Sequence, residues 1–185
     1  MVATRIWTRE EVLALPDDGN RHELIDGELL VTPAPRGRHQ QGIGELYLRL
    51  APYVRAHGIG AAVFAPADLD LRSGQLVQPD LFVGAMVDGR APVEWDEFGI
   101  PLLVVEVLSP STAKDDRVRK RHLYQRVGVP VYWIVDLDAR VVEEWTPDAS
   151  RPRIIEDRLI WQPDTGAPTL EIELKAYFAR AWGEV

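Results

Sequence analysis

The stretch "PLLVVEVLSPSTAKDDRVRKRHLY", residues 101–124, begins with an apolar run that is typical of a buried strand and holds one carboxylate. Leucine and valine occupy positions 102–105 and 107–108, and Glu106 lies between them. Burying an ionised carboxylate costs several kcal/mol unless a cation or good hydrogen bonds compensate for it. The sequence therefore raises the question of which groups face Glu106.

A helix is predicted directly after this strand, over about 113–127. Thr112 and Asp115 match a capping box at its start. Helical spacing predicts an inward face, which consists of Ala113, Asp116, Lys120, Leu123 and Val127. Asp116 and Lys120 are charged and lie near the end of the Glu106 strand, so the three side chains are predicted to converge on one site.

Three structural alternatives remain open for these charges. Asp116 and Lys120 are also an ordinary (i, i+4) pair, worth only about 0.2–0.5 kcal/mol on an exposed helix. A helix phase wrong by one residue would turn both side chains to water. Glu106 could instead pair with an arginine from another element.

A second carboxylate, Asp80, lies in "LVQPDLFVG", residues 76–84, where it follows Pro79 and opens an apolar strand. Two carboxylates on neighbouring strands can hold Mg²⁺ or Mn²⁺, since hard cations prefer oxygen ligands. Such a metal polarises a phosphoryl oxygen and lowers the pKa of a bound water. Lys120 would orient that water and offset developing negative charge. The set predicts phosphodiester hydrolysis, with Asp80, Glu106 and Lys120 as the catalytic residues.

The rest of the chain predicts a mixed α/β fold. A hairpin is expected over 22–32 around the turn Asp26–Gly27, and a helix over 39–56 whose inward face includes His39 at its start. Strands are predicted at 62–71, 76–84, 129–136, 141–146, 153–161 and 169–174, with an amphipathic segment at 175–182. The core order of helix, three strands, helix and strand predicts a mixed β-sheet flanked by helices, with the hairpin before it and extra strands after it.

Composition limits the class of protein. The 185 residues fit one domain, 1–185, and 46% of them are hydrophobic, which allows a sizeable core. The absence of cysteine excludes disulfides and thiolate chemistry. No signal peptide or membrane-spanning run is evident, so a cytoplasmic protein is expected that does not act at a membrane.

The net charge of −8 argues against a general nucleic-acid coat, because phosphate binding depends on lysine and arginine. Charge is unevenly distributed, however, and residues 114–126 are rich in basic side chains. This run can be a phosphate-binding patch, although the solvated face of a single helix is the simpler interpretation.

Several of these segments together resemble the Uma2-type restriction endonucleases, once listed as a domain of unknown function. The resemblance covers about residues 8–178 and rests on "HELIDGEL", His39, "VQPDLFV", "VVEVLSPSTAKDD", Lys120, Tyr124 and "VYWIVD". It implies the PD-(D/E)xK nuclease fold, with Asp80 and Glu106 as metal ligands.

The position of the lysine departs from the commoner pattern of that fold. The usual lysine lies two residues after the strand acid, where this chain has Leu108. The resemblance implies that the lysine has moved to the following helix, at Lys120. Glu23 and His39 match family positions without an assigned role. Taken singly, Glu23 is predicted to be a strand surface residue and His39 a satisfied histidine at a helix start.

The resulting hypothesis is a Mg²⁺- or Mn²⁺-dependent endonuclease that acts on nucleic acid, with DNA favoured over RNA. Glu23, His39 and Asp116 are candidate supporting residues. A homodimer or larger even-numbered homo-oligomer would suit cleavage of both strands of a duplex. The alternatives are a catalytically inactive binding or scaffold protein with the same fold, and a metal-dependent hydrolase of small phosphoesters.

Overall fold

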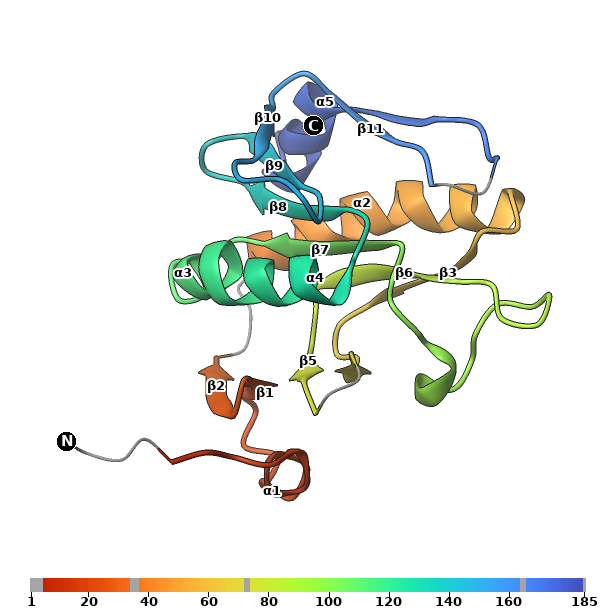
Figure 1. The fold of residues 1–185 in the computed structure, drawn as a ribbon. Helices are drawn as coiled ribbons and strands as arrows, with labels where there is room; N and C mark the ends of the chain where they lie inside the picture. The colour runs from red at the N-terminus through yellow and green to blue at the C-terminus, as the bar shows by residue number, and fades with distance from the viewer. Residues whose placement is uncertain (1–4, 34–36, 72–73, 164–165, 185) are drawn as a thin grey trace.

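The computed structural model describes residues 5–33, 37–71, 74–163 and 166–184, which form a six-stranded mixed sheet between helices, with two smaller sheets beside it (Figure 1). The strand order of the main sheet is β10-β9-β8-β7-β6-β3. Its strands in chain order are β3 (Gly60–Phe64), β6 (Leu81–Ala85), β7 (Leu103–Val107), β8 (Tyr132–Asp136), β9 (Val141–Trp145) and β10 (Arg153–Ile155). Strands β7 and β8 are parallel, and the other neighbours are antiparallel.

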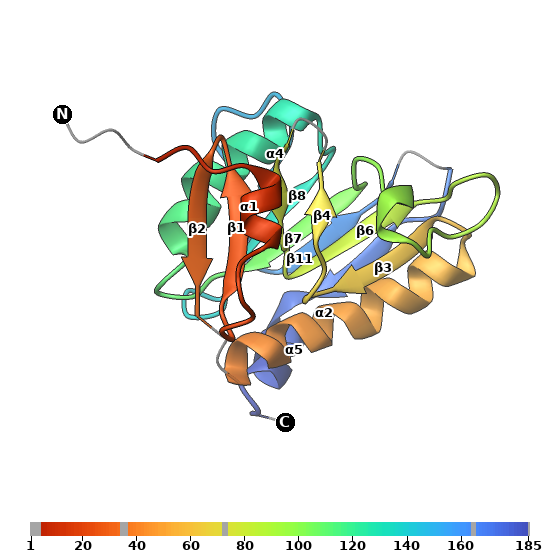
Figure 2. The same cartoon turned by 90° about the horizontal axis from the view of Figure 1, so that it is seen from below.

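Helices cover both faces of the main sheet, as Figure 2 shows. On one face lie α2 (Gly37–Ala56) and α5 (Leu174–Ala181). On the other lies a continuous helical segment made of α3 (Ala113–Asp115), the π-helical turn η2 (Asp116–Lys120) and α4 (Arg121–Val127). The helical segment joins β7 to β8, so these two strands and their crossover form a βαβ unit.

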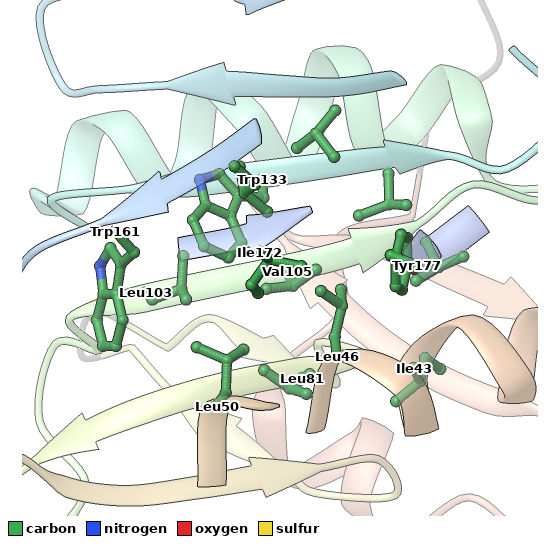
Figure 3. Packing of buried hydrophobic residues seen from close by; sticks show 14 of the residues in the cluster. Ile43, Leu46, Leu50, Leu81, Leu103, Val105, Trp133, Trp161, Ile172 and Tyr177 are labelled. Carbon is green, nitrogen blue, oxygen red and sulfur yellow. The ribbon is translucent and has the colours of Figure 1, made fainter. Parts of the chain in front are cut away.

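Alternation along the central strands divides the core into two clusters. Val105 and Trp133 point toward α2 and α5, where they pack with Leu46 and Leu50 (Figure 3). Their neighbour Val104 belongs to the cluster under α4. Because successive strand residues face opposite sides, Glu106 shares the α4 face with Val104.

A second sheet, with strand order β2-β1-β5-β4, lies beside the α4 face of the first. It contains β1 (Arg21–Ile25), β2 (Glu28–Thr32), β4 (Leu69–Asp70) and β5 (Leu76–Val77), and α1 (Arg9–Leu13) precedes it. Asp26 and Gly27 both have positive φ, of 52° and 79°, which confirms the predicted hairpin turn. The third sheet pairs β11 (Arg158–Trp161) with β12 (Leu170–Glu173).

The predicted mixed α/β fold, its core order and the segments before and after that core are confirmed, while several boundaries are wrong. The expected strands 62–71 and 76–84 each break in two, because the chain passes between the main and second sheets near Pro66 and Pro79. Proline cannot donate to a sheet ladder, which favours an interruption there. The expected strand 153–161 also divides, between β10 and β11. Residues 88–100 include a short 3-10 helix, η1 (Trp95–Glu97).

Helix α2 continues through Pro52 to Ala56, as the predicted range 39–56 requires. The predicted capping box of the later helix needs correction. Thr112 lies at the start of α3, but its side chain accepts no capping hydrogen bond from that helix. It accepts one instead from the backbone N–H of Ser109, at 3.3 Å, so the capping box is absent.

Candidate active site

Asp80 and Glu106 lie side by side on the α4 face of the main sheet. Leu81 pairs with Val105 across β6 and β7, so Asp80, one residue earlier, falls opposite Glu106. The Asp80 carboxylate accepts a hydrogen bond from the backbone N–H of Val107 at 2.9 Å, which ties it to the Glu106 strand. Asp80 is 2% exposed and Glu106 is 1% exposed, so both carboxylates need partners inside the protein.

Lys120 is the cation that faces Glu106. Its Nζ lies 3.0 Å from Oε1 of Glu106 and 3.0 Å from Oε1 of Glu23, and 3.5 Å from Oδ1 of Asp116. The Tyr124 hydroxyl, one turn later, donates to the same Glu106 oxygen at 3.1 Å. The buried Glu106 carboxylate therefore has two partners, the Lys120 ammonium and the Tyr124 hydroxyl.

The π-helical turn explains how the helix delivers two charges to one site. Asp116 and Lys120 are its first and last residues, and both are buried. A π turn is an uncommon local widening of a helix that occurs frequently at functional sites. The predicted inward face is therefore correct for these two residues, although the helix is not regular.

Asp80 has a separate set of partners. Nε2 of His39, from the first turn of α2, lies 2.9 Å from its Oδ2, and the Arg21 guanidinium lies 2.7 Å from its Oδ1. Burial raises the pKa of Asp80, but the hydrogen bond and charge of His39 and the charges of Arg21 and Lys120 outweigh it. The pKa therefore lies below its usual value, and Asp80 is an ionised carboxylate at neutral pH.

The site carries more acid than base. Four carboxylates, those of Asp80, Glu106, Glu23 and Asp116, share this site with two permanent cations, Lys120 and Arg21, and His39 lies beside Asp80. Burial first, and then the neighbouring carboxylates, raise the pKa of Glu106 well above its usual value despite Lys120.

The same excess of acid acts on the two charged residues of the π turn. Burial raises the pKa of Asp116 to about 6 although Lys120 opposes it. Burial lowers the pKa of Lys120, but the surrounding carboxylates, led by Glu106, outweigh this and raise it well above its usual value. Lys120 is therefore a stable ammonium.

These residues form the floor of a pocket of about 660 Å³. The pocket lies between the β1–β2 hairpin, the start of α2, the loop after β7 and the turn after β8. Its lining includes Arg21, Glu23, His39, Asp80, Glu106, Leu108, Ser109, Thr112, Arg117, Lys120 and Asp136. A volume of this size is typical of small-molecule and cofactor sites.

The structure brings together all six residues singled out in the sequence. Asp80, Glu106, Lys120, Glu23 and His39 line the pocket, and Asp116 contacts Lys120 just behind it. The prediction that Glu23 is a strand surface residue is wrong, because Glu23 is 1% exposed and forms an ion pair with Lys120. His39 lies at a helix start as predicted, and its Nε2 contacts Asp80. The prediction that this histidine is satisfied is wrong for Nδ1, which is buried without a hydrogen-bond partner in the described part of the chain.

The sequence did not single out Arg21, and it placed Arg117 only in the basic run at 114–126 and not at this site. Arg21 lies directly before "HELIDG", so strand alternation from Glu23 could have placed it on the same face. Arg117 lines the pocket and contacts Glu143 at 2.7 Å and Asp136 at 3.1 Å. No local pattern predicts these partners, because they lie on β9 and at the end of β8.

The basic run at 114–126 is not a free cationic face. Arg121 lies over the ring of Trp145 at 4.6 Å. Other arginines of the run form ion pairs with acids, namely Arg117 with Asp136 and Glu143, Arg119 with Glu28 and Asp115, and Arg126 with Asp26. Such pairing reduces the charge that this helix offers to a phosphate backbone.

The carboxylates of this site suit a divalent cation, but cationic side chains already bind them. Two carboxylates on adjacent strands and a net negative charge meet its basic requirements. Lys120 and Arg21 supply the counter-charge in the described structure, and no cluster of three or more histidine, aspartate or glutamate side chains is arranged for a metal among the described residues. A metal between Asp80 and Glu106 would therefore have to share or replace these cationic contacts.

Comparisons with known proteins agree with the fold. A family model described as "Uma2: Putative restriction endonuclease" matches residues 9–175. Among solved structures, the chain is similar to one described as a putative nuclease belonging to DUF820 from Anabaena variabilis ATCC 29413. The two share 18% identity and a TM-score of 0.75, over 95% of this chain and 99% of that chain, which shows a common fold. A search of curated protein sequences gave no significant match.

Proposed function

The chain belongs to the Uma2 family, and on that premise we propose that it is a metal-dependent endonuclease that hydrolyses phosphodiester bonds of DNA. The observation that carries the proposal is the convergence of Asp80, Glu106 and Lys120 on the floor of one pocket, with Lys120 Nζ 3.0 Å from Glu106. The excess of carboxylates over cations at this point favours a divalent ion as the missing charge.

Asp80 and Glu106 would hold Mg²⁺ or Mn²⁺. When bound, such an ion polarises the phosphoryl oxygen and acidifies a coordinated water. Asp80 is suited to this role because His39, Arg21 and Lys120 keep its pKa low and its carboxylate ionised. A bound cation in addition to Lys120 would favour the ionised form of Glu106, since burial and neighbouring acids raise its pKa.

Lys120 would serve the reacting groups. Its ammonium, held by Glu106 and Glu23, is positioned to orient the attacking water and to offset negative charge that develops on the phosphate. Glu23 and Asp116 would position Lys120, and His39 would fix the orientation of Asp80. Position 108, where the commoner form of this fold has its lysine, holds leucine in this chain.

A hydrolase of small phosphoesters is a second candidate that specific observations favour. The pocket has the volume of a small-molecule site, and the basic run beside it is largely paired with acids. The net charge of −8 also disfavours a long polyanion.

Cleavage assays with purified protein separate the two candidates. Supercoiled plasmid, single-stranded DNA, RNA and a chromogenic phosphodiester should each be incubated with Mg²⁺, with Mn²⁺ and with a chelator. The proposal expects metal-dependent nicking of plasmid that is lost in Asp80→Asn. Hydrolysis of the small diester alone would replace it with the second candidate, and metal binding without any hydrolysis would indicate an inactive binding protein.

A further inference from the structure

Strand β1 sends two opposite charges into the site from outside the main sheet. Arg21 and Glu23 are two residues apart on β1, so they face the same side. Arg21 binds Asp80, the acid on which the metal proposal rests, and Glu23 binds Lys120. The hairpin thus pairs one opposite charge with Asp80 and another with Lys120.

The Arg21 contact leaves little of the Asp80 carboxylate unoccupied. Oδ2 already faces two groups, Nε2 of His39 and the backbone N–H of Val107, both at 2.9 Å. Oδ1 accepts from Arg21 at 2.7 Å, which is the length of a strong charge-assisted bond. A metal bound between Asp80 and Glu106 would need an oxygen that Arg21 now occupies, beside a fixed positive charge.

The positive charge of Arg21 is poorly screened by water. Its side chain is 14% exposed, and the Asp80 side chain is 3% exposed. Two cations that share one carboxylate in such a setting repel each other far more than they would in bulk water. Arg21 also donates to the backbone carbonyl of Gln78 at 3.3 Å, so it keeps one protein partner if it leaves Asp80.

We infer that Arg21 competes with the divalent cation for Asp80, and so sets how tightly this site binds metal. The inference rests on the proposed function only in taking Asp80 as a ligand. It assigns Arg21 the role of an exchangeable counter-ion, which holds the metal-free site together and must share or yield Oδ1 of Asp80 when metal enters. Arg21 is therefore a positioning residue whose removal should improve metal binding while it weakens the metal-free protein.

Calorimetric titration with Mn²⁺ tests this directly. Arg21→Gln is expected to bind Mn²⁺ about tenfold more tightly than the wild type, which corresponds to about 1.4 kcal/mol. Its melting temperature without metal should fall, and the rise on adding Mn²⁺ should be larger than in the wild type. Arg38→Gln is the matched control, because Arg38 lines the same pocket but pairs with Asp138 and not with Asp80. This control should bind Mn²⁺ as the wild type does.

The outcomes separate the inference from the proposed function. Unchanged or weaker Mn²⁺ binding in Arg21→Gln, with a wild type that binds and cleaves, overturns the inference alone. Binding that appears only in Arg21→Gln supports it, and absence of binding in both proteins overturns the inference together with the metal site. Arg21→Met, which preserves most of the side-chain length, takes the place of Arg21→Gln if that variant does not fold.

Discussion

Glu106 shows that one buried carboxylate in the sequence can predict a partner in the structure. One carboxylate inside an apolar strand predicts a compensating partner, and Lys120 is that partner at 3.0 Å. What the strand could not reveal is the excess of acid around the pair. Glu23 looks like an exposed residue of a hairpin, and only the approach of the second sheet to the π turn buries it against Lys120.

Lys120→Ala should abolish hydrolysis while it leaves metal binding largely intact, because the carboxylates hold the ion and the lysine serves water and phosphate. Leu108 lies on the same strand face as Glu106 and lines the pocket. Leu108→Lys added to Lys120→Ala is expected to restore a detectable part of the activity. Full recovery is not expected, since a placement wrong by about 1 Å can cost about 100-fold in rate.

Plasmid nicking and Mn²⁺ calorimetry on the single and double variants measure this. Circular dichroism must first show that the double variant is folded. No recovery in a folded double variant would weaken the equivalence of the two positions, and full activity of Lys120→Ala would remove the proposed role of Lys120.

Asp116→Asn should stabilise the metal-free protein at high pH. The pKa of Asp116 is about 6 in the folded protein against a reference value of 3.8, so its neutral form favours folding. This contribution is present below about pH 4 and is lost as pH rises through 6. The difference of about 2 pKa units corresponds to about 3 kcal/mol, which asparagine would avoid. Thermal melts should show a gain for the variant at pH 8 and little at pH 4, and an equal effect at both would contradict this origin.

At the scale of elements, the periodicity of apolar residues predicted the helices, whose formation depends mainly on local sequence. The 3.6-residue period located α2, and the segment from α3 to α4 is found within the predicted 113–127. The breaks in the predicted strands 62–71 and 76–84 were missed because they depend on a second sheet, in which β5 pairs with the hairpin and β4 pairs with β5. The π turn was missed for another reason, since the residue pattern of this segment does not distinguish it from a regular helix.

Arg117 and Arg121 provide a test of how the basic helix takes part in binding. Arg117 lines the pocket, whereas Arg121 lies over Trp145 and contacts Gln125. Each phosphate contact adds nearly one unit to the slope of log affinity against log salt. Arg117→Ala should therefore flatten this slope by up to about one unit, and Arg121→Ala should leave it unchanged. Fluorescence anisotropy with labelled DNA at several salt concentrations measures both, and equal slopes in all three proteins would place the phosphates elsewhere.

At the scale of the whole molecule, the two sheets and the helical segment meet at one pocket. Asp80 and Glu106 come from the main sheet, Glu23 and Arg21 from the second sheet, and Lys120 from the π turn (Figure 2 shows these elements). Within the described ranges, none of the helices is long and apolar enough to cross a membrane. An even-numbered assembly stays a prediction, and so does the assignment of residues 1–185 to a single domain.

Because several elements share this site, a bound metal should stabilise the entire fold. A ligand that binds only the folded state adds about 2.7 kcal/mol at a concentration of 100 times its Kd. For a chain of 185 residues this corresponds to a rise of roughly 5–10 °C in melting temperature. Mg²⁺ or Mn²⁺ should produce such a rise in the wild type and a smaller one in Asp80→Asn and Glu106→Gln.

The acidic surface of the chain requires a control for this experiment, because divalent cations also screen its net charge of −8. Glu171→Gln changes an exposed carboxylate that pairs with Arg158, and neither residue lines the pocket, so this variant should respond to metal as the wild type does. Differential scanning calorimetry of the four proteins, each with and without metal at constant ionic strength, gives the comparison. If the wild type and both site variants gain equally, the stabilisation is general screening, and Asp80 and Glu106 do not hold the ion.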